Sequence, residues 1–179
     1  NFGIVFQGAA LFDSLPIWEN ISFKLKYLGT HSAQERRHLA IQKLELVGLE
    51  RTILNLYPSE LSGGMQKRVG IARAIATNPK ILFFDEPTSG LDPIMANTIN
   101  NLIRNIIKEL GSTAITISHD LNSILAIADN VALLREGMIE WTGDIETFKT
   151  TENPYIQEFI NPNSNFLLDC SAKPNAAGT

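Results

Sequence analysis

The chain has 179 residues, of which 44% are hydrophobic and 19% are charged, and its formal net charge at pH 7 is −4. This length and composition are typical of one globular domain with a sizeable core. Acidic and basic residues are mixed along the chain, so no nucleic-acid partner is expected. No apolar stretch reaches the roughly 18 residues that span a membrane. The single cysteine, Cys170, lies in a polar stretch and favours neither a disulfide framework nor a catalytic thiol.

The amino-terminal part of the chain predicts a strand followed by a mainly helical segment. The apolar run Phe2–Phe6 predicts a buried strand that ends at Gln7. From 13 to 57 we expect mainly helical structure with about one clear helix, because Ser32 and Glu35 have the spacing of a capping box.

The next segment predicts a helix, a strand and a second helix. The first helix covers 62–77 and is stopped by Asn78-Pro79. The run 81–84 is apolar at every position, as is typical of a strand covered on both faces. Asp92-Pro93 has the residue types of an N-cap and a first helical position. An apolar stripe at helical spacing then continues to Gly111.

The remaining segments complete an alternation of strands and helices. We expect a strand at 113–118, a short helix at 120–129, and two strands joined by a turn at Glu136-Gly137. The alternation predicts an α/β fold with a mostly parallel sheet that is flanked by helices and antiparallel at its end. The last stretch, 161–179, is rich in Asn, Pro and Ala and predicts a flexible C-terminal tail.

Two carboxylates follow the apolar strand 81–84. Asp85 and Glu86 are therefore expected at the carboxyl end of a strand, where open α/β sheets place their ligand sites. Asp85 has the chemistry of a Mg²⁺ ligand, since Mg²⁺ prefers oxygen ligands. Glu86 has the chemistry to orient or deprotonate a water that attacks a phosphate. The alternative interpretation is a helix N-cap with a solvated neighbour.

A serine and two glycines precede the helix 62–77. The hydroxyl of Ser62 can cap this helix, while Gly63 and Gly64 let an anion approach the backbone closely. The free N–H groups and the partial positive charge of a helix start favour a phosphate there. The pattern therefore predicts an anion site, and the alternative is a capped helix after a glycine turn.

Five elements occur in a fixed order: Gln7 at a strand end, 61–64, Asp85-Glu86, 89–92, and His119 after a second strand. In this order they resemble the ATP-binding subunits of ABC transporters, and the resemblance covers nearly the whole chain. It implies a P-loop NTPase-type α/β fold with a helical subdomain. It also implies ATP hydrolysis, with ATP and Mg²⁺ as the bound groups.

The resemblance implies a role for each residue of the site. Asp85 and Gln7 would hold Mg²⁺, and Glu86 would be the catalytic base. Gln7 would also contact the attacking water, and His119 would contact the γ-phosphate. Asp92 would lie at the interface between two subunits. The residues implied to bind nucleotide are, besides Asp92, the signature stretch Leu61, Ser62, Gly63, Gly64, Met65 and Gln66.

The resemblance also implies partners. The signature motif of this family binds ATP held by the opposite subunit, so two copies are expected to form a symmetric homodimer with two shared ATP sites. An integral membrane permease is expected to dock on the helical segment near Phe12, Pro16 and Trp18. The alternative is that these three side chains belong to the core of that segment.

The expected organisation is a partial ATPase domain at 1–160, with a helical subdomain at 13–77 and the remainder of the catalytic core at 78–160.

The phosphate loop of the family, G-x-x-x-x-G-K-[ST], is not found, because no glycine of the chain is followed by Lys-Ser or Lys-Thr. The chain also begins without Met inside an expected strand. We therefore expect the amino-terminal part to be missing and the chain alone to be inactive.

The segment after the first strand resembles one branch of the family. Ala10–Ser14 and Glu19-Asn20 resemble the corresponding stretch of Mla- and Mce-type ATPases, and Met65 fits the same branch. Ala9 and Pro16 depart from it, since Gly and Thr are common there. The branch implies a subunit at the cytoplasmic face of the bacterial inner membrane that energises phospholipid movement, with an Mce-type lipid-binding protein as a further partner.

Three other functions stay open. The ATPase subunit of a polar-solute importer would share the same motifs. Soluble ABC ATPases of DNA repair and chromosome maintenance carry a long insertion before the signature, and those of translation carry two ATPase units, neither of which the sequence shows. A pure binding module would lack the phosphate loop even in its intact form.

Overall fold

The computed structural model describes residues 2–160. It divides into two compact units, one ending at Ile127 and one beginning at Ala128. This division falls inside 78–160, which the sequence analysis treats as one part, and the predicted subdomain boundaries stay predictions. The predicted tail, 161–179, lies outside the described residues together with Cys170.

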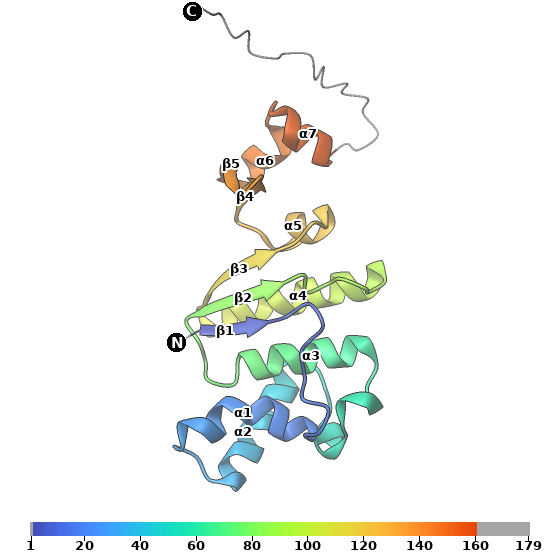
Figure 1. Ribbon diagram of the computed structural model, residues 1–179, viewed down its shortest axis with the longest axis vertical. Coiled ribbons are helices and arrows are strands. Elements are labelled where there is room, and N and C mark those ends of the chain that lie inside the picture. The colour runs from blue at the N-terminus through green and yellow to red at the C-terminus, as the bar shows by residue number, and fades with distance from the viewer. Residues whose placement is uncertain (1, 161–179) are drawn as a thin grey trace, which may run out of the picture. The chain divides into compact units, whose positions relative to one another are not determined.

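A three-stranded parallel sheet organises the first unit (Figure 1). Its strands are β1 (Phe2–Val5), β2 (Ile81–Asp85) and β3 (Thr113–Ile117), in the order β1-β2-β3. The central strand β2 pairs in parallel with both neighbours. The predicted α/β fold with a parallel sheet is therefore confirmed.

The antiparallel strands form a separate sheet in the second unit. β4 (Asn130–Arg135) and β5 (Met138–Asp144) pair with each other in a two-stranded sheet. The expectation that the parallel sheet itself becomes antiparallel at its end is therefore wrong within residues 2–160. The predicted turn is confirmed, since Glu136 and Gly137 have the two positive φ angles, 49° and 80°, that a two-residue turn requires. Tertiary packing decides whether a hairpin joins a larger sheet, and the residues of the turn carry no information about this.

Seven α-helices are present in residues 2–160, and none of them is long and apolar enough to cross a membrane. Those of the first unit are α1 (Ile17–Leu28), α2 (Ala33–Leu46), α3 (Gly63–Ala74), α4 (Pro93–Leu110) and α5 (Leu121–Ile127), with short 3₁₀ helices at Arg51–Asn55 and Pro58–Glu60. Those of the second unit are α6 (Ile145–Thr150) and α7 (Pro154–Ile160).

The helical segment before α3 contains two α-helices where the sequence predicted about one. The predicted helix is α2, and its capping box is confirmed, because Ser32 Oγ accepts from the Glu35 N–H and Glu35 Oε2 accepts from the Ser32 N–H. The other helix is α1, which has no side-chain cap at Pro16. It is recognisable mainly by its end, where Gly29 takes a left-handed conformation.

The core of the first unit joins the helical segment to the sheet. α1, α2 and α3 pack against one another, and fully buried side chains such as Ile21 and Leu44 lie between them. α3 packs closely on β1, since a Cβ at Gly3 would collide with the carbonyl oxygen of Ala74. α4 lies behind the strands in the view of Figure 1 and contributes Ile103 to the same core.

The other face of the parallel sheet is exposed. Ile81 is 42% exposed although the apolar run of β2 predicts a strand covered on both faces, so that prediction is wrong for this chain. A run without polar residues indicates that both faces of the strand are apolar, but it does not indicate which element covers each face. The large apolar side chains exposed along the strands are Phe2, Ile4, Ile81, Ile115 and Ile117; we call them the open sheet face.

Asn20 fixes the loop that leads into α1. The side chain is fully buried, and its Oδ1 accepts from the Phe12 N–H at 2.7 Å. Its Nδ2 donates to the carbonyl oxygens of Phe12 at 3.0 Å and Leu15 at 2.8 Å. A single amide side chain thus bonds to three backbone groups of the loop, of which only the Phe12 carbonyl oxygen has a second partner there, the Leu15 N–H at 3.1 Å.

We expect Asn20→Ala to lower the free energy of unfolding by about 1–3 kcal/mol, because the Phe12 N–H and the Leu15 carbonyl oxygen lose the partner that the buried amide provides. Urea denaturation followed by circular dichroism measures this change. The matched control is Asn105→Ala on the exposed side of α4, which should cost less than about 0.5 kcal/mol. Equal stability of the two variants would contradict the role given to Asn20.

Candidate active site

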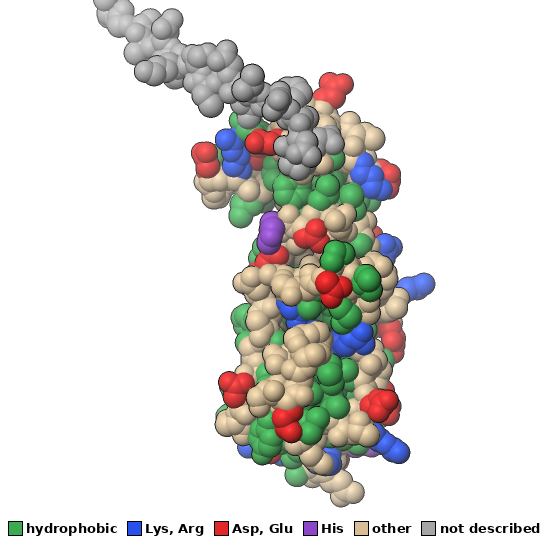
Figure 2. All heavy atoms as spheres, turned by 90° about the vertical axis from the view of Figure 1, so that its right-hand side faces the viewer, with side chains coloured by type: hydrophobic (Ala, Val, Ile, Leu, Met, Phe, Trp, Pro, Cys, Tyr) green, Lys and Arg blue, Asp and Glu red, His purple; other side chains and the backbone are tan. Residues whose placement is uncertain are grey.

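The candidate site lies at the carboxyl ends of β2 and β3, the edge of the sheet that faces the viewer in Figure 2. Asp85 is the last residue of β2, Glu86 follows it, and His119 lies two residues beyond β3. A cleft of about 500 Å³ opens here, with Glu86 and His119 in its wall. Figure 2 shows a histidine beside acidic side chains on this face. The structure thus brings together residues that are 33 positions apart in the sequence.

Glu86 has a backbone conformation that is unusual for a residue with a side chain. Its φ is 46°, in the left-handed region that favours glycine. Its N–H donates to the carbonyl oxygen of Ile117 at 3.0 Å, which extends the pairing of β2 with β3 by one residue. Strained backbone of this kind is common at functional sites, where the surrounding structure holds it in place.

Glu86 and His119 contact each other directly. Oε1 of Glu86 accepts from the His119 backbone N–H at 3.0 Å and lies 2.7 Å from ring Nδ1. Because a carboxylate only accepts, Nδ1 carries a proton, and Nε2 is the ring nitrogen left to face a ligand. The His119 side chain is 80% exposed and that of Glu86 is 16% exposed. The pair therefore combines a sheltered carboxylate with a solvent-facing imidazole.

Buried polar groups connect the loop after Glu86 with the start of α5 and with α4. Ser123 is fully buried, and its hydroxyl donates to Asp120 Oδ2 at 2.6 Å and accepts from Asn100 Nδ2 at 3.0 Å. Since one hydroxyl has one proton, the Thr88 hydroxyl, 3.0 Å away, must donate to Ser123. This network fixes the segment that carries His119, and it joins residues too far apart in the sequence for a local pattern to predict it.

The side chain of Gln7 contacts the loop that follows Glu86. Its Nε2 donates to Ser89 Oγ at 3.1 Å, and its own backbone carbonyl oxygen accepts from Lys67 Nζ at 3.1 Å. Burial lowers the pKa of Lys67, while the nearby negative charge of Glu86 opposes that shift. The sequence pattern indicates no role for Lys67, and none for Ser89 beyond its place in the element 89–92, because both make contacts between distant segments.

The signature stretch lies at the start of α3, and its members are exposed, buried or, for Met65 and Gln66, partly buried. Ser62 and Gly63 are exposed, and Ser62 Oγ caps the helix by accepting from the Met65 N–H at 3.3 Å. Leu61 and Gly64 are buried, and a Cβ on Gly64 would lie 2.8 Å from Cε of Met95. The exposed residues are thus the ones free to meet an anion.

Gln66 and Asp92 make local bonds. Gln66 Nε2 donates to the carbonyl oxygens of Pro58 at 2.9 Å and Leu61 at 3.3 Å. The carboxylate of Asp92 caps α4 by accepting from the N–H groups of Ile94 and Met95, both at 3.0 Å. The predicted N-cap is confirmed, and the roles of Gln66 in nucleotide binding and of Asp92 at an interface stay predictions.

The residues predicted to hold Mg²⁺ fit only a partial coordination shell. Asp85 is exposed at the strand end, and Gln7 keeps its amide oxygen because the amide nitrogen makes the bond to Ser89. Within residues 2–160, no cluster of three or more His, Cys, Asp or Glu residues could hold a metal. One carboxylate with one amide oxygen suits Mg²⁺ that takes its other ligands from phosphate and water.

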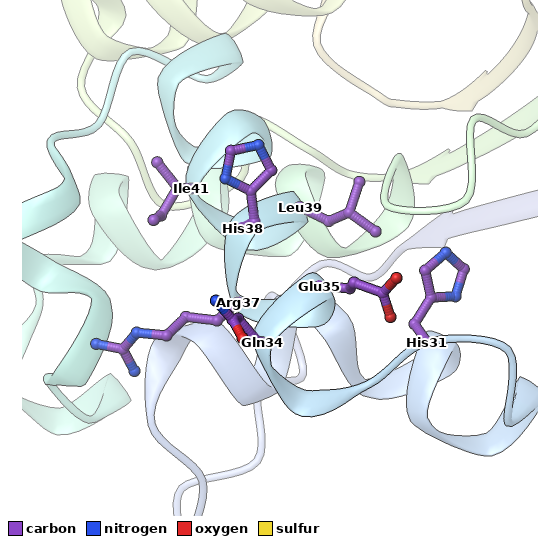
Figure 3. Close-up of a pocket in the computed structure, with 7 residues that line it drawn as sticks. All are labelled: His31, Gln34, Glu35, Arg37, His38, Leu39 and Ile41. Atoms are coloured by element: carbon purple, nitrogen blue, oxygen red, sulfur yellow. The ribbon is translucent and has the colours of Figure 1, made fainter.

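A second hollow, of about 640 Å³, lies along α2 (Figure 3). Its side chains point in several directions from α2 and from His31 in the loop before it, and Glu35 is already engaged in the capping box. His38 lies 3.3 Å from the Gln42 amide on the same helix. The arrangement does not gather reactive groups around one point, so the site at the sheet edge is the better candidate.

Comparison with known proteins shows a family match over the first part of the chain. The family described as "ABC transporter" matches residues 1–89. The chain is 35% identical over 160 residues to "Probable ribonucleotide transport ATP-binding protein mkl" of Mycobacterium leprae, covering 89% of the chain and 46% of that protein. It is 41% identical over 162 residues to "Methionine import ATP-binding protein MetN" of Carboxydothermus hydrogenoformans, covering 90% and 48%.

The name of a third relative refers to neither nucleotide nor methionine transport. The chain is 39% identical over 175 residues to "Protein TRIGALACTOSYLDIACYLGLYCEROL 3, chloroplastic" of Arabidopsis thaliana, covering 89% of the chain and 50% of that protein. The chain thus spans about half the length of the curated relatives it matches.

A solved structure supports the fold. The dimeric ATP-binding cassette MJ0796, in a post-hydrolysis state bound to ADP and Pi, matches with a TM-score of 0.69 and 36% identity. The match covers 79% of this chain and 62% of that one.

We expect Ser123→Ala to lower the free energy of unfolding by about 1–3 kcal/mol, because the amide of Asn100 and the hydroxyl of Thr88 lose a buried partner. Chemical denaturation measures the loss. Ser14→Ala, at an exposed position of the loop before α1, is the matched control and should change stability by less than about 0.5 kcal/mol. If both substitutions leave the free energy of unfolding unchanged, the network does not stabilise the fold.

Proposed function

We propose that the intact protein binds and hydrolyses ATP to energise a transporter, because residues 1–89 match the ABC transporter family and the chain is similar to ATP-binding proteins of transporters. The single observation that supports hydrolysis at this site is the contact of Glu86 with His119, 2.7 Å between Oε1 and Nδ1, at the edge where β2 and β3 end. The solved MJ0796 cassette with ADP and Pi supports the same chemistry by similarity.

In the proposed reaction, Glu86 takes a proton from a water whose oxygen attacks the γ-phosphorus of ATP. The bond from that phosphorus to the bridging β–γ oxygen breaks, so the products are ADP and phosphate. His119 contacts the γ-phosphate through Nε2, the nitrogen that Glu86 does not use.

Asp85 and the amide oxygen of Gln7 would hold Mg²⁺, which neutralises charge on the phosphates when it is bound. Gln7 would also orient the attacking water. The bond from its Nε2 to Ser89 supports this role, because it fixes the side chain next to the loop that follows Glu86.

The signature stretch is proposed to act on ATP held by a second copy of the chain. Ser62 and Gly63 are exposed at the start of α3, where N–H groups and the helix dipole favour a phosphate. Two copies that face each other would form two shared sites, with Asp92 at their interface. The dimeric MJ0796 cassette supports this arrangement by similarity.

The phosphate loop is proposed to lie in sequence outside this chain. The open sheet face supports this, because a sheet of this class normally has both faces covered and here Phe2 and Ile117 are 55% and 63% exposed. The matched cassette MJ0796 also extends beyond the part that the chain covers. On this proposal the chain alone does not hydrolyse ATP.

For the cargo, we propose phospholipid in a bacterial envelope, with the subunit on the cytoplasmic face of the inner membrane and an Mce-type lipid-binding protein as a partner. The support is the resemblance of Ala10–Ser14 and Glu19-Asn20 to the Mla and Mce branch. The Arabidopsis relative, which has the name of a glycolipid, is compatible with it.

The second candidate is a polar-solute importer. Two relatives favour it, because their names refer to ribonucleotide transport and methionine import.

Both candidate functions require a membrane permease, which we propose docks on the helical segment. Phe12 is 41% exposed there, while Trp18 is partly buried beneath Arg36 and Arg37, whose guanidinium carbons lie 5.6 Å from its ring centroid. Phe12 is therefore the better contact residue.

We expect Glu86→Gln in the intact protein to lower the ATPase rate at least about a hundredfold, because the amide cannot take the proton from water. ATP should still bind and hold the subunits together, so a stable dimer should appear in size-exclusion chromatography with ATP and Mg²⁺. Glu109→Gln, at an exposed position near the end of α4, is the matched control. Normal turnover by the Glu86 variant would refute the assignment of the base.

We expect the intact subunit, purified from its own membrane in mild detergent, to bring with it a multi-pass permease, an Mce-type protein and phospholipid. Mass spectrometry of the purified complex identifies all three. A permease with a soluble solute-binding protein would instead favour the polar-solute importer. Absence of any membrane partner would contradict both and favour a soluble ABC function.

A further inference from the structure

The loop that carries Gln7 has a strained backbone. Ala9 and Ala10 follow each other with positive φ angles, 60° and 47°. Left-handed backbone is unfavourable at any residue with a Cβ, and two such residues in succession need external support. Ala9 is buried, with 2% of its surface exposed, so the support lies in the protein interior.

One face of α3 supplies this support. Lys67, Gly70 and Arg73 are spaced three residues apart and lie on the same side of the helix. Arg73 donates to the carbonyl oxygens of Ala9 at 2.7 Å and Ala10 at 2.6 Å. Lys67 donates to the carbonyl oxygen of Gln7 at 3.1 Å. Two cations of one helix thus bind three of the four carbonyl groups of residues 7–10.

Gly70 allows the helix to come this close. A Cβ at Gly70 would lie 3.3 Å from Cβ and 3.4 Å from Cα of Ala9, a spacing that any larger side chain would disturb. Burial lowers the pKa of both Lys67 and Arg73, as expected for cations withdrawn from water. We call Lys67, Gly70 and Arg73 the α3 clamp.

We propose that the α3 clamp positions the side chain of Gln7 for ATP hydrolysis. The clamp fixes the backbone of the loop, and the Gln7 amide then reaches Ser89, three residues after Glu86. Lys67 and Arg73 act through Gln7 and are positioning residues. This inference rests on the proposed function, because the placement of Gln7 affects catalysis only if this site hydrolyses ATP.

The clamp also connects two sites through one helix. The start of α3 carries Ser62 and Gly63, which are proposed to meet ATP on the partner, and the clamp begins four residues after Gly63.

The decisive variant is Lys67→Met in the intact protein, since methionine keeps the apolar stem and removes the donor. We expect kcat to fall about tenfold, the change expected for the loss of one positioning contact, while KM for ATP changes less than about twofold. Lys67→Arg keeps a donor and should restore most of the rate. The matched control is Lys108→Met on the exposed side of α4, which should keep the normal rate.

A double-mutant cycle tests whether Lys67 acts through Gln7. In a Gln7→Ala background, Lys67→Met should lower kcat no further, because the side chain that it positions is absent. A further tenfold loss in that background would overturn the inference and assign Lys67 a direct effect on Glu86 instead.

Hydrogen exchange of the intact protein provides a readout that does not depend on ATPase activity. The Ala9 N–H donates to the Phe6 carbonyl oxygen at 2.9 Å, so its exchange reports on the order of the loop. In Lys67→Met we expect at least about tenfold faster exchange of the peptide that contains Ala9, as for local opening of a loop. Unchanged exchange in Lys67→Met, with normal kcat, would refute the clamp.

These outcomes separate the two proposals. If the wild-type protein hydrolyses ATP and Glu86→Gln does not, the proposed function stands whatever Lys67→Met does. If the wild-type protein does not hydrolyse ATP, the proposed function fails together with the catalytic role of the clamp. In that case faster exchange in Lys67→Met would show only that the clamp orders the loop.

Discussion

The parallel pairing of β2 with β3 is the constraint on which the site depends. Asp85 pairs with Ile117, so both strands end at the same edge of the sheet and present their next residues side by side. The N–H of Glu86 continues this pairing, and its left-handed turn directs the carboxylate to His119. The geometry of the candidate active site follows from this register.

Strained backbone and compensating bonds occur together around that edge. Glu86 is held by bonds to Ile117 and His119, and Ala9 and Ala10 are held by Arg73. Each unfavourable conformation is thus fixed by charged or backbone partners from another segment, as strain at functional sites requires. Contacts from other segments therefore hold Gln7 and His119 at defined positions, although both residues lie in loops.

The helical segment and the sheet share one core, but the sheet keeps an apolar face open. Buried residues such as Leu44 and Ile103 belong to one continuous cluster, whereas Ile115 is 51% exposed on the far face. Exposed apolar surface of this extent usually marks a contact with another segment or chain. Since the chain spans about half the length of its relatives, this face is where the remaining sequence is proposed to pack.

The sequence by itself determined the features that depend on neighbouring residues. The capping box at Ser32, the caps at Ser62 and Asp92, and the turn at Glu136 are local, because each bond closes within a few residues. Only the tertiary structure decided which face of the sheet is covered, which sheet receives the hairpin, and that Lys67 reaches the loop of Gln7. Those outcomes depend on contacts between distant segments, and a linear pattern of residue types does not specify such contacts.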